Sequence, residues 1–235
     1  MASEPGAQPE HGAQPEQEAQ PEQALLTIIL ASTRLSAVPL VPEVEIHQAS
    51  EPISLWEDTE LATGRTDLDP PFWAFAWAGG RALARYLLDH PEVAGGRRVL
   101  DIASGSGLVA IAAAKAGAFS VAAGDIDPLA VAAISVNAAA NDVRIAARVF
   151  DLAQEDAGDA EVVLAGDVFY QRELAELALE FLRAAVRAGA EVLVADPGRA
   201  FVPVESLTAL ARYEVPVLTA IEDVPVKTVT VYRLG

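Results

Sequence analysis

The chain has 235 residues, no cysteine, three histidines and a formal net charge of −18 at pH 7. The lack of cysteine excludes disulfides, thiolate metal sites and cysteine nucleophiles, and the spacing of the histidines predicts no metal site. The negative charge argues against a nucleic-acid-binding surface, which would carry a basic stripe, and favours a cationic ligand or a basic protein as partner. Because no apolar run reaches membrane-spanning length, we expect a cytoplasmic protein without membrane contact.

The first 23 residues differ in composition from the rest. The tetrapeptide Ala-Gln-Pro-Glu occurs three times between positions 7 and 22, and residues 1–23 hold five glutamates and no lysine or arginine. It lacks large apolar side chains, so we expect residues 1–23 to form a disordered tail, and it has neither the basic region nor the apolar core of a targeting segment. We interpret residues 24–80 as an N-terminal cap that ends in an aromatic segment, and residues 81–235 as one α/β domain.

Residues 24–35 could form a helix or a strand, and residues 44–48 and 53–56 suggest short extended pieces. Beyond residue 80 the elements alternate: the patterns predict helices at 81–89, 107–117, 128–140, 171–188 and 204–212, and strands at 98–102, 119–125, 144–150, 161–167 and 191–196. This alternation indicates a parallel sheet with helices on both faces. Two final β-rich runs, 217–221 and 227–233, are separated by five residues, too few for a parallel crossover, so the last strand must be antiparallel.

A short apolar run that contains an acid precedes a glycine turn and an alanine-rich helix, from residue 99 onward. Gly105 and Gly107 let the backbone turn sharply and approach a ligand, which the N-terminus of the next helix then faces. The spacing formally satisfies the dinucleotide fingerprint G-x-G-x-x-A, with Asp125 at the end of the next strand. Asp101 favours another ligand, because a carboxylate there suits a cationic amino group, as in S-adenosylmethionine, and repels a pyrophosphate. Both acids could instead serve only the turns at their strand ends.

Further acids follow the next strands. We interpret Asp125 as a ligand of ribose hydroxyls and Asp127, just before Pro128, as the N-cap of a helix. Asp151 and Leu152 follow the strand 144–150, where the carboxylate can accept a hydrogen bond from an adenine amino group and a backbone amide can meet a ring nitrogen. An aspartate after a strand is also typical of a simple turn.

Asp167 and Tyr170 follow the central-strand pattern of residues 162–166, which places them at the carboxyl edge, where ligands of open α/β sheets bind. An acid and a phenol there can orient an amine nucleophile, and the alternative for Asp167 is a cap of the helix 171–188. Upstream, four aromatic residues occupy the six positions from 72 to 77. They either pack in the core or form an aromatic wall that suits a sulfonium methyl group through cation–π attraction.

Several motifs together resemble one known family: the run from Pro70 to Gly80, Val99-Leu100-Asp101, Gly124-Asp125-Ile126-Asp127-Pro128, Asp167-Val168-Phe169-Tyr170 and Asp196-Pro197-Gly198-Arg199. From about residue 24 to the end, the chain resembles the electron-transfer-flavoprotein β-subunit lysine methyltransferases and their bacterial relatives, which are class I S-adenosylmethionine-dependent methyltransferases. One departure is Ala103, where the loop of this family often has glycine. We expect a slightly stiffer loop that still binds its ligand.

The resemblance implies a seven-stranded Rossmann-like sheet with an antiparallel last strand, and methyl transfer from S-adenosylmethionine to a lysine ε-amine of a protein such as the electron transfer flavoprotein β-subunit. It implies Asp167 and Tyr170 as catalytic residues, which position the amine while its proton leaves through water. It implies cofactor contacts from Trp77, Asp101, Ser104, Gly105, Gly107, Asp125, Ile126, Asp151, Leu152 and Asp167. It implies substrate contacts from Trp73, Phe75, Phe169 and Tyr170.

Three alternatives stay open at this point. Within the same fold, the substrate could be a small amine or heterocycle, such as a nicotinamide-like ring, or a ribosomal protein. A different class, a NAD-type oxidoreductase, would use the dinucleotide fingerprint, but Asp101 and the terminal hairpin argue against it. A non-catalytic cofactor-binding module would not need all three of Asp101, Asp125 and Asp167. We further expect a monomer.

Overall fold

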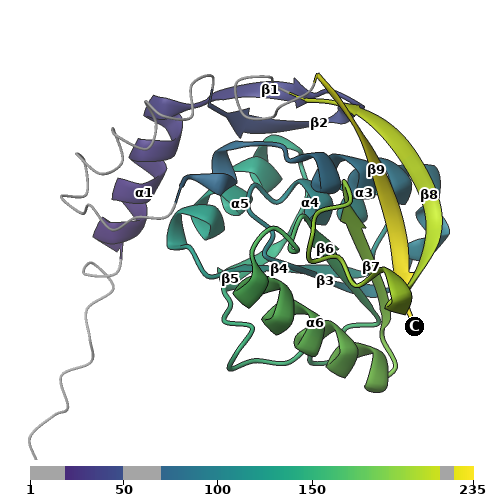
Figure 1. The fold of residues 1–235 in the computed structure, drawn as a ribbon. Helices are drawn as coiled ribbons and strands as arrows, with labels where there is room; N and C mark the ends of the chain where they lie inside the picture. Colours follow the sequence, from purple (N-terminus) through teal and green to yellow (C-terminus); the bar gives the residue numbers. More distant parts are fainter. Residues whose placement is uncertain (1–18, 50–69, 218–224) are drawn as a thin grey trace, which may run out of the picture.

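The computed structural model describes residues 19–49, 70–217 and 225–235, and for residues 19–22 the backbone only. Its centre is a seven-stranded sheet of order β5-β4-β3-β6-β7-β9-β8 (Figure 1). The strands are β3 (Arg98–Ile102), β4 (Ser120–Asp125), β5 (Ala146–Val149), β6 (Val162–Gly166), β7 (Glu191–Asp196), β8 (Leu207–Pro216) and β9 (Val226–Leu234). The first five are parallel, and β9 is antiparallel to both β7 and β8. The predicted sheet and its antiparallel last strand are therefore confirmed.

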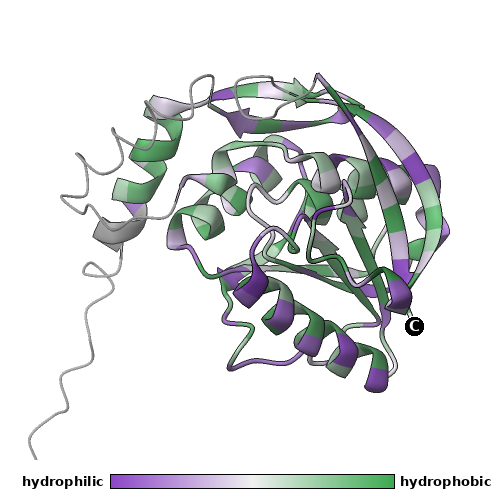
Figure 2. Cartoon of the chain, in the orientation of Figure 1, coloured by the Kyte–Doolittle hydropathy of each residue, from purple (hydrophilic) through white to green (hydrophobic). Residues whose placement is uncertain are grey.

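Helices cover the two faces of the sheet unequally (Figure 1). One face carries α3 (Ala78–Asp89), α4 (Leu108–Lys115) and α5 (Pro128–Ala140), and the other carries α6 (Arg172–Arg187). Helix α6 buries one stripe of side chains against the sheet and leaves its opposite side polar (Figure 2), which is the pattern of a helix with a single packed face. The residues of that stripe are Ala175, Ala178, Phe181, Leu182 and Ala185.

The helix predicted at residues 204–212 is wrong. A single 3-10 turn, η3 (Val204–Ser206), leads directly into β8, which pairs with β9 along its whole length. The alanine, leucine, arginine and glutamate residues of this segment favour a helix locally, but pairing with β9 satisfies the backbone hydrogen bonds and overrides that weak preference. Of the strand predicted at 217–221, Val217 follows the end of β8, and the remaining positions lie outside the described residues.

The N-terminal segment forms a cap over α5 (Figure 1). It contains α1 (Ala19–Ser32), β1 (Arg34–Val38) and β2 (Val41–Gln48), and β1 and β2 form an antiparallel pair. Helix α1 therefore begins inside the predicted tail, and residues 53–56 lie outside the described part of the chain. Asn137 of α5 is fully buried; its amide oxygen accepts from the backbone N–H of His47, and its amide nitrogen donates to the backbone oxygen of Ser106. One side chain thus ties the cap to the glycine turn.

Two further observations concern the described residues as a whole. No helix among them is both long and apolar enough to cross a membrane. A hollow of about 480 Å³ is lined by the amino-terminal parts of β3 and β4, by β5 and by residues 154–160. It contains none of the side chains predicted to bind cofactor or substrate, so the functional site is sought at the opposite edge of the sheet.

Candidate active site

Four acids line the carboxyl edge of the sheet. Asp125 ends β4, Asp101 lies near the end of β3, Asp167 follows β6 and Asp196 ends β7. Because β4, β3, β6 and β7 are neighbours in that order and run parallel, these carboxylates come from four adjacent strands of one edge. Asp101 and Asp196 are buried, and the other two are half-buried. Such an edge favours ligands that carry positive charge.

Two of these acids hold the glycine turn. Asp125 accepts hydrogen bonds from the backbone N–H of Gly105 at 2.8 Å and from that of Asp127 at 3.1 Å. Asp101 accepts from the hydroxyl of Ser104 and from the backbone N–H of Ala110 at 3.2 Å, in the first turn of α4. The turn is therefore built around the carboxylates, and their roles in the turn and toward a ligand are compatible, since each carboxylate oxygen can accept two hydrogen bonds.

Burial raises the pKa of Asp101 to about 7, because its side chain is removed from water. The hydrogen bonds from Ser104 and Ala110 pull this pKa down, and the neighbouring charge of Asp125 pushes it up. Burial also raises the pKa of Asp125, against its hydrogen bonds from the backbone. A cation bound beside Asp101 would favour its ionised form, which makes this position suited to an ammonium group.

Ala103 has a φ of +47°, in the left-handed region that favours glycine. This is the position at which the sequence departs from the expected glycine. The conformation costs an alanine about 1–2 kcal/mol relative to a right-handed one. The turn keeps the backbone path despite the side chain, as expected for a stiffer version of the same loop.

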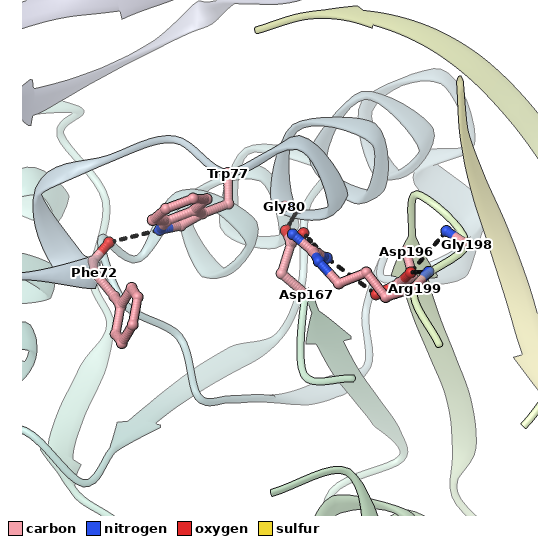
Figure 3. Close-up of polar contacts among 7 residues, drawn as sticks. All are labelled: Phe72, Trp77, Gly80, Asp167, Asp196, Gly198 and Arg199. Atoms are coloured by element: carbon pink, nitrogen blue, oxygen red, sulfur yellow. Dashed lines mark hydrogen bonds and ion pairs between the residues drawn. The ribbon is translucent and has the colours of Figure 1, made fainter. Parts of the chain in front are cut away.

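Asp167 is held from three directions, and Figure 3 shows two of them, Gly80 and Arg199. Its backbone N–H donates to the oxygen of Ala195 at 3.0 Å, one carboxylate oxygen accepts from the N–H of Gly80 at 2.8 Å, and the other accepts from Nη1 of Arg199 at 2.6 Å. Its φ is +60°, a strained value for a residue with a side chain, of the kind that surrounding contacts maintain at functional sites. Helix α6 begins at Arg172 without a side-chain cap, so the alternative reading of Asp167 as a helix cap is wrong.

Arg199 bridges two carboxylates through one nitrogen atom. Its Nη1 lies 2.6 Å from Asp167 and 3.0 Å from Asp196 (Figure 3). The other oxygen of Asp196 accepts from the backbone N–H groups of Gly198 and Arg199, at 2.7 Å each. Burial raises the pKa of Asp167 even though Arg199 lowers it. Sequence reasoning noted the motif around Arg199 but assigned it no role, and the ion pair between positions 167 and 199 has no local signal.

The aromatic segment divides into buried and accessible members. Trp77 donates from Nε1 to the backbone oxygen of Phe72 at 2.9 Å, and the ring of Phe72 lies 5.8 Å from that of Trp77 and 5.5 Å from that of Tyr170. Phe75 is buried beside Trp77, with ring centroids 6.0 Å apart. Trp73 is only 1% exposed and packs between α1 and α5. Phe72, which the prediction omitted, therefore joins Trp77 to Tyr170.

Phe169 is also only 1% exposed and packs in the cluster beneath the sheet, against α6. The predicted substrate contacts of Phe169 and Trp73 do not fit this burial, and we correct them to packing roles. Both lie in short turns in which consecutive residues are buried, Trp73 with Ala74 and Phe169 with Val168, and spacing alone does not tell which aromatic side chains enter the core. Tyr170 is partly exposed.

The remaining predicted residues follow β4 and β5, and they differ in what they contact. Asp127 accepts from the N–H of Leu129 at 2.8 Å, so its role as the N-cap of α5 is confirmed. Asp151 accepts from the N–H of Ala153 at 2.9 Å, which is the turn reading, and this bond does not exclude a ligand contact. Leu152 is half-buried, and Ile126 is 62% exposed just after β4. Within the described residues, no three potential metal ligands come together.

Comparison with known proteins decides the family. Over 176 residues, 74% of this chain and 70% of the relative, the sequence is 38% identical to the electron transfer flavoprotein beta subunit lysine methyltransferase of Xenopus laevis. The protein of the same name from Danio rerio is 37% identical over 183 residues, 75% of this chain and 70% of the relative. The chain belongs to the electron transfer flavoprotein beta subunit lysine methyltransferase family. It is therefore a methyltransferase, as its motifs predicted.

Two further comparisons place this family member more broadly. A family model described as ribosomal protein L11 methyltransferase (PrmA) matches residues 82–193. A solved structure, Thermoplasma acidophilum 1320, superposes with a TM-score of 0.52 at 18% identity, covering 66% of this chain and 88% of that one, which supports the fold alone. The PrmA match begins after the aromatic segment and ends before Asp196. It therefore covers the glycine turn and much of the sheet but not all of the candidate substrate region.

The residues of this family member fit S-adenosylmethionine. A Cβ on Gly105 would point toward the aromatic segment, with the Cα of Trp73 at 3.9 Å and the oxygen of Phe72 at 4.0 Å as its nearest atoms, so the turn and this segment face one another. The carboxylates of buried Asp101 and half-buried Asp125 can accept from an ammonium and from ribose hydroxyls. Asp101 would repel a pyrophosphate, which disfavours a dinucleotide.

Proposed function

We propose that this protein transfers a methyl group from S-adenosylmethionine to a lysine ε-amine of an electron transfer flavoprotein β-subunit. The observation that carries the proposal is Asp167, held at the carboxyl edge beside Tyr170 in a chain of this family. The named substrate of the relatives supports the protein class. The ring of Tyr170 next to Phe72 supports an apolar and aromatic surround for the stem of a lysine side chain.

The cofactor would be held by residues on both sides of the glycine turn. Asp101 would accept from its ammonium group, and Asp125 from its ribose hydroxyls. Exposed Ile126 would lie against the adenine, with Asp151 and Leu152 at its polar edge. Ser104, Gly105 and Gly107 would shape the backbone around it, and Trp77 would close the aromatic side. When bound, S-adenosylmethionine supplies a methyl group on a positively charged sulfur, which leaves as a neutral thioether.

The chain must orient the amine and favour its neutral form. A lysine has an ordinary pKa of about 10.4, so deprotonating it at pH 7 costs roughly 4–5 kcal/mol. Partial burial beside Phe72 and Tyr170 lowers the pKa of an amine by desolvation and offsets part of that cost. Asp167 accepts from an N–H of the amine and directs its lone pair, and the released proton goes to water. Catalysis of this kind depends on proximity and orientation.

The first test uses purified protein, tritiated S-adenosylmethionine and the electron transfer flavoprotein β-subunit of the same organism, with the modified residue located by mass spectrometry. Asp101→Asn should lose cofactor affinity, whereas Asp167→Ala should lose far more in turnover than in cofactor affinity. Full turnover in Asp167→Ala would remove the proposed positioning role. Methylation of a small amine, with no labelled lysine in the protein, would move the substrate to the small-molecule class.

Ribosomal protein L11 is a second candidate substrate, because the PrmA model matches residues 82–193. That match excludes the aromatic segment and also Gly80 and Arg199, which hold the carboxylate of Asp167, and so bears on the cofactor half more than on substrate choice. L11 should be included beside the flavoprotein subunit in the same assay. Preferential labelling of L11 would reverse the order of the two candidates.

A further inference from the structure

The arrangement around Arg199 places a fixed cation at the proposed site of a cationic substrate. The side chains of Asp167, Asp196 and Arg199 are 11%, 0% and 21% exposed, so all three are largely removed from water. A single guanidinium nitrogen contacts both carboxylates. Counted together, the three groups carry one net negative charge. Without the guanidinium the same place would carry two.

That difference matters for an amine nucleophile. A lysine ammonium beside two uncompensated carboxylates would be held in its charged form, which has no lone pair and cannot attack a methyl group. A nearby cation acts in the opposite direction, since it disfavours the ammonium and lowers the pKa of the amine. The bridging position lets Arg199 do this while Asp167 still accepts a hydrogen bond from the amine.

We propose that Arg199 is a positioning residue that sets the protonation state of the substrate amine through its bridge between Asp167 and Asp196. This inference rests on the proposed lysine methylation. In the step it supports, R–NH₃⁺ first loses one proton to water. The nitrogen lone pair then forms the N–C bond, the C–S bond breaks with its electron pair left on sulfur, and the product is a methylammonium.

Other charged and titratable groups face Asp167 from neighbouring elements. Arg81, buried in α3, acts on it by charge across the N-terminus of that helix and donates its own Nη1 hydrogen bond to the backbone oxygen of Pro216. Tyr170 follows it in the chain, and Asp101 lies on the adjacent strand β3. The Nη1 atom of Arg199 contacts both carboxylates, so removal of this side chain changes the charge of the pair directly.

The experiment compares two variants whose charge effects are opposite. Arg199→Gln removes the cation and should move the midpoint of the kcat–pH profile upward by about 1–2 units, without raising KM for the flavoprotein subunit. Asp196→Asn removes one carboxylate and leaves Arg199 in place, so its midpoint should move downward. Arg199→Lys keeps the charge and should stay close to the wild-type midpoint with a lower kcat. Arg183→Gln, on the exposed side of α6, is the matched control and should leave the profile unchanged.

A second readout needs no cofactor. In cofactor-free Arg199→Gln, the carboxylate of Asp167, whose pKa is already raised by burial, ionises without the neighbouring cation that lowers it, so the free energy of unfolding should fall more steeply than in wild type as the pH rises from 5 to 8. Equal slopes, or kcat midpoints that shift in the same direction in Arg199→Gln and Asp196→Asn, would overturn the role of Arg199 while wild-type lysine methylation still stands. Absence of lysine methylation by the wild type would overturn the proposed function and this inference together.

Discussion

Gly79 is the position where the structure makes its sharpest prediction. A Cβ there would lie 2.5 Å from the backbone oxygen of Ala195 and 2.6 Å from Oδ2 of Asp167. Ala195 cannot move away easily, because it lies within β7 and its oxygen accepts from the N–H of Asp167. Forcing a methyl group into such a place costs about 1–3 kcal/mol. Displacing the Asp167 carboxylate from the N–H of Gly80 costs about another 1.5–3 kcal/mol.

Substitution of Gly79 by alanine should therefore lower the free energy of unfolding by about 2–5 kcal/mol, after a helix gain of roughly 0.5–1 kcal/mol is allowed for. It should also reduce kcat more than cofactor affinity, because Asp167 moves and Asp101 does not. Urea unfolding and cofactor titration measure the two effects.

The neighbouring glycine provides the control. A Cβ on Gly80 would meet only Cγ2 of Val109, at 3.8 Å, which is an ordinary contact. Gly80→Ala keeps the backbone N–H that binds Asp167 and should be neutral or stabilising by up to about 1 kcal/mol. Equal stability of the two alanine variants would show that position 79 has room for a Cβ. It would refute the claim that α3 lies too close to Ala195 and Asp167 for any residue but glycine at that position.

Three further predictions concern the glycine turn and the cap. In cofactor-free protein the pKa of Asp101 is raised to about 7, so its contribution to stability is lost as the pH rises from about 4 to 7. Between pH 4 and pH 8, the free energy of unfolding of Asp101→Asn should therefore rise relative to that of wild type by up to about 4 kcal/mol, as measured by urea unfolding. A difference that stays constant with pH would contradict this. Ala103→Gly should stabilise the protein by up to about 1 kcal/mol, and a loss of more than that in thermal unfolding would disprove strain at φ +47°. Asn137→Ala leaves the buried N–H of His47 and oxygen of Ser106 without their partner and should cost about 2–5 kcal/mol; a smaller loss would show that water replaces the amide.

The parallel part of the fold could be predicted because each strand is a short apolar run followed by a turn, and the turns carry the acids. That pattern alone places Asp101, Asp125 and Asp167 at one edge, since the carboxyl ends of parallel strands share an edge. It failed at β8, whose composition favours a helix. The strand exists because β9 supplies its hydrogen bonds from across a hairpin, which local composition does not record.

The candidate site was predicted less completely for a similar reason. Phe169 and Tyr170 are adjacent, yet one is buried under the sheet and the other is partly exposed at the edge. Their spacing from Asp167 cannot distinguish these two fates, because that depends on which face α6 covers. Arg199 had no role assigned, since its partner is 32 positions away in the sequence and the bridge exists only once β6 and β7 are neighbours.

Asp167 also shows why a motif alone is an incomplete description of this site. Its carboxylate is oriented by Gly80 from α3 and by Arg199 from the segment after β7, and its backbone is held by Ala195. These contacts come from two stretches distant in sequence from Asp167, the start of α3 and the end of β7 with the residues after it, and an acid in the same motif without them would be free to rotate away. The strained φ of Asp167 persists because these three contacts act together. Substitutions at Gly79 and Arg199, which lie outside residues 167–170 and outside the glycine turn, should therefore alter the reaction as strongly as changes within residues 167–170.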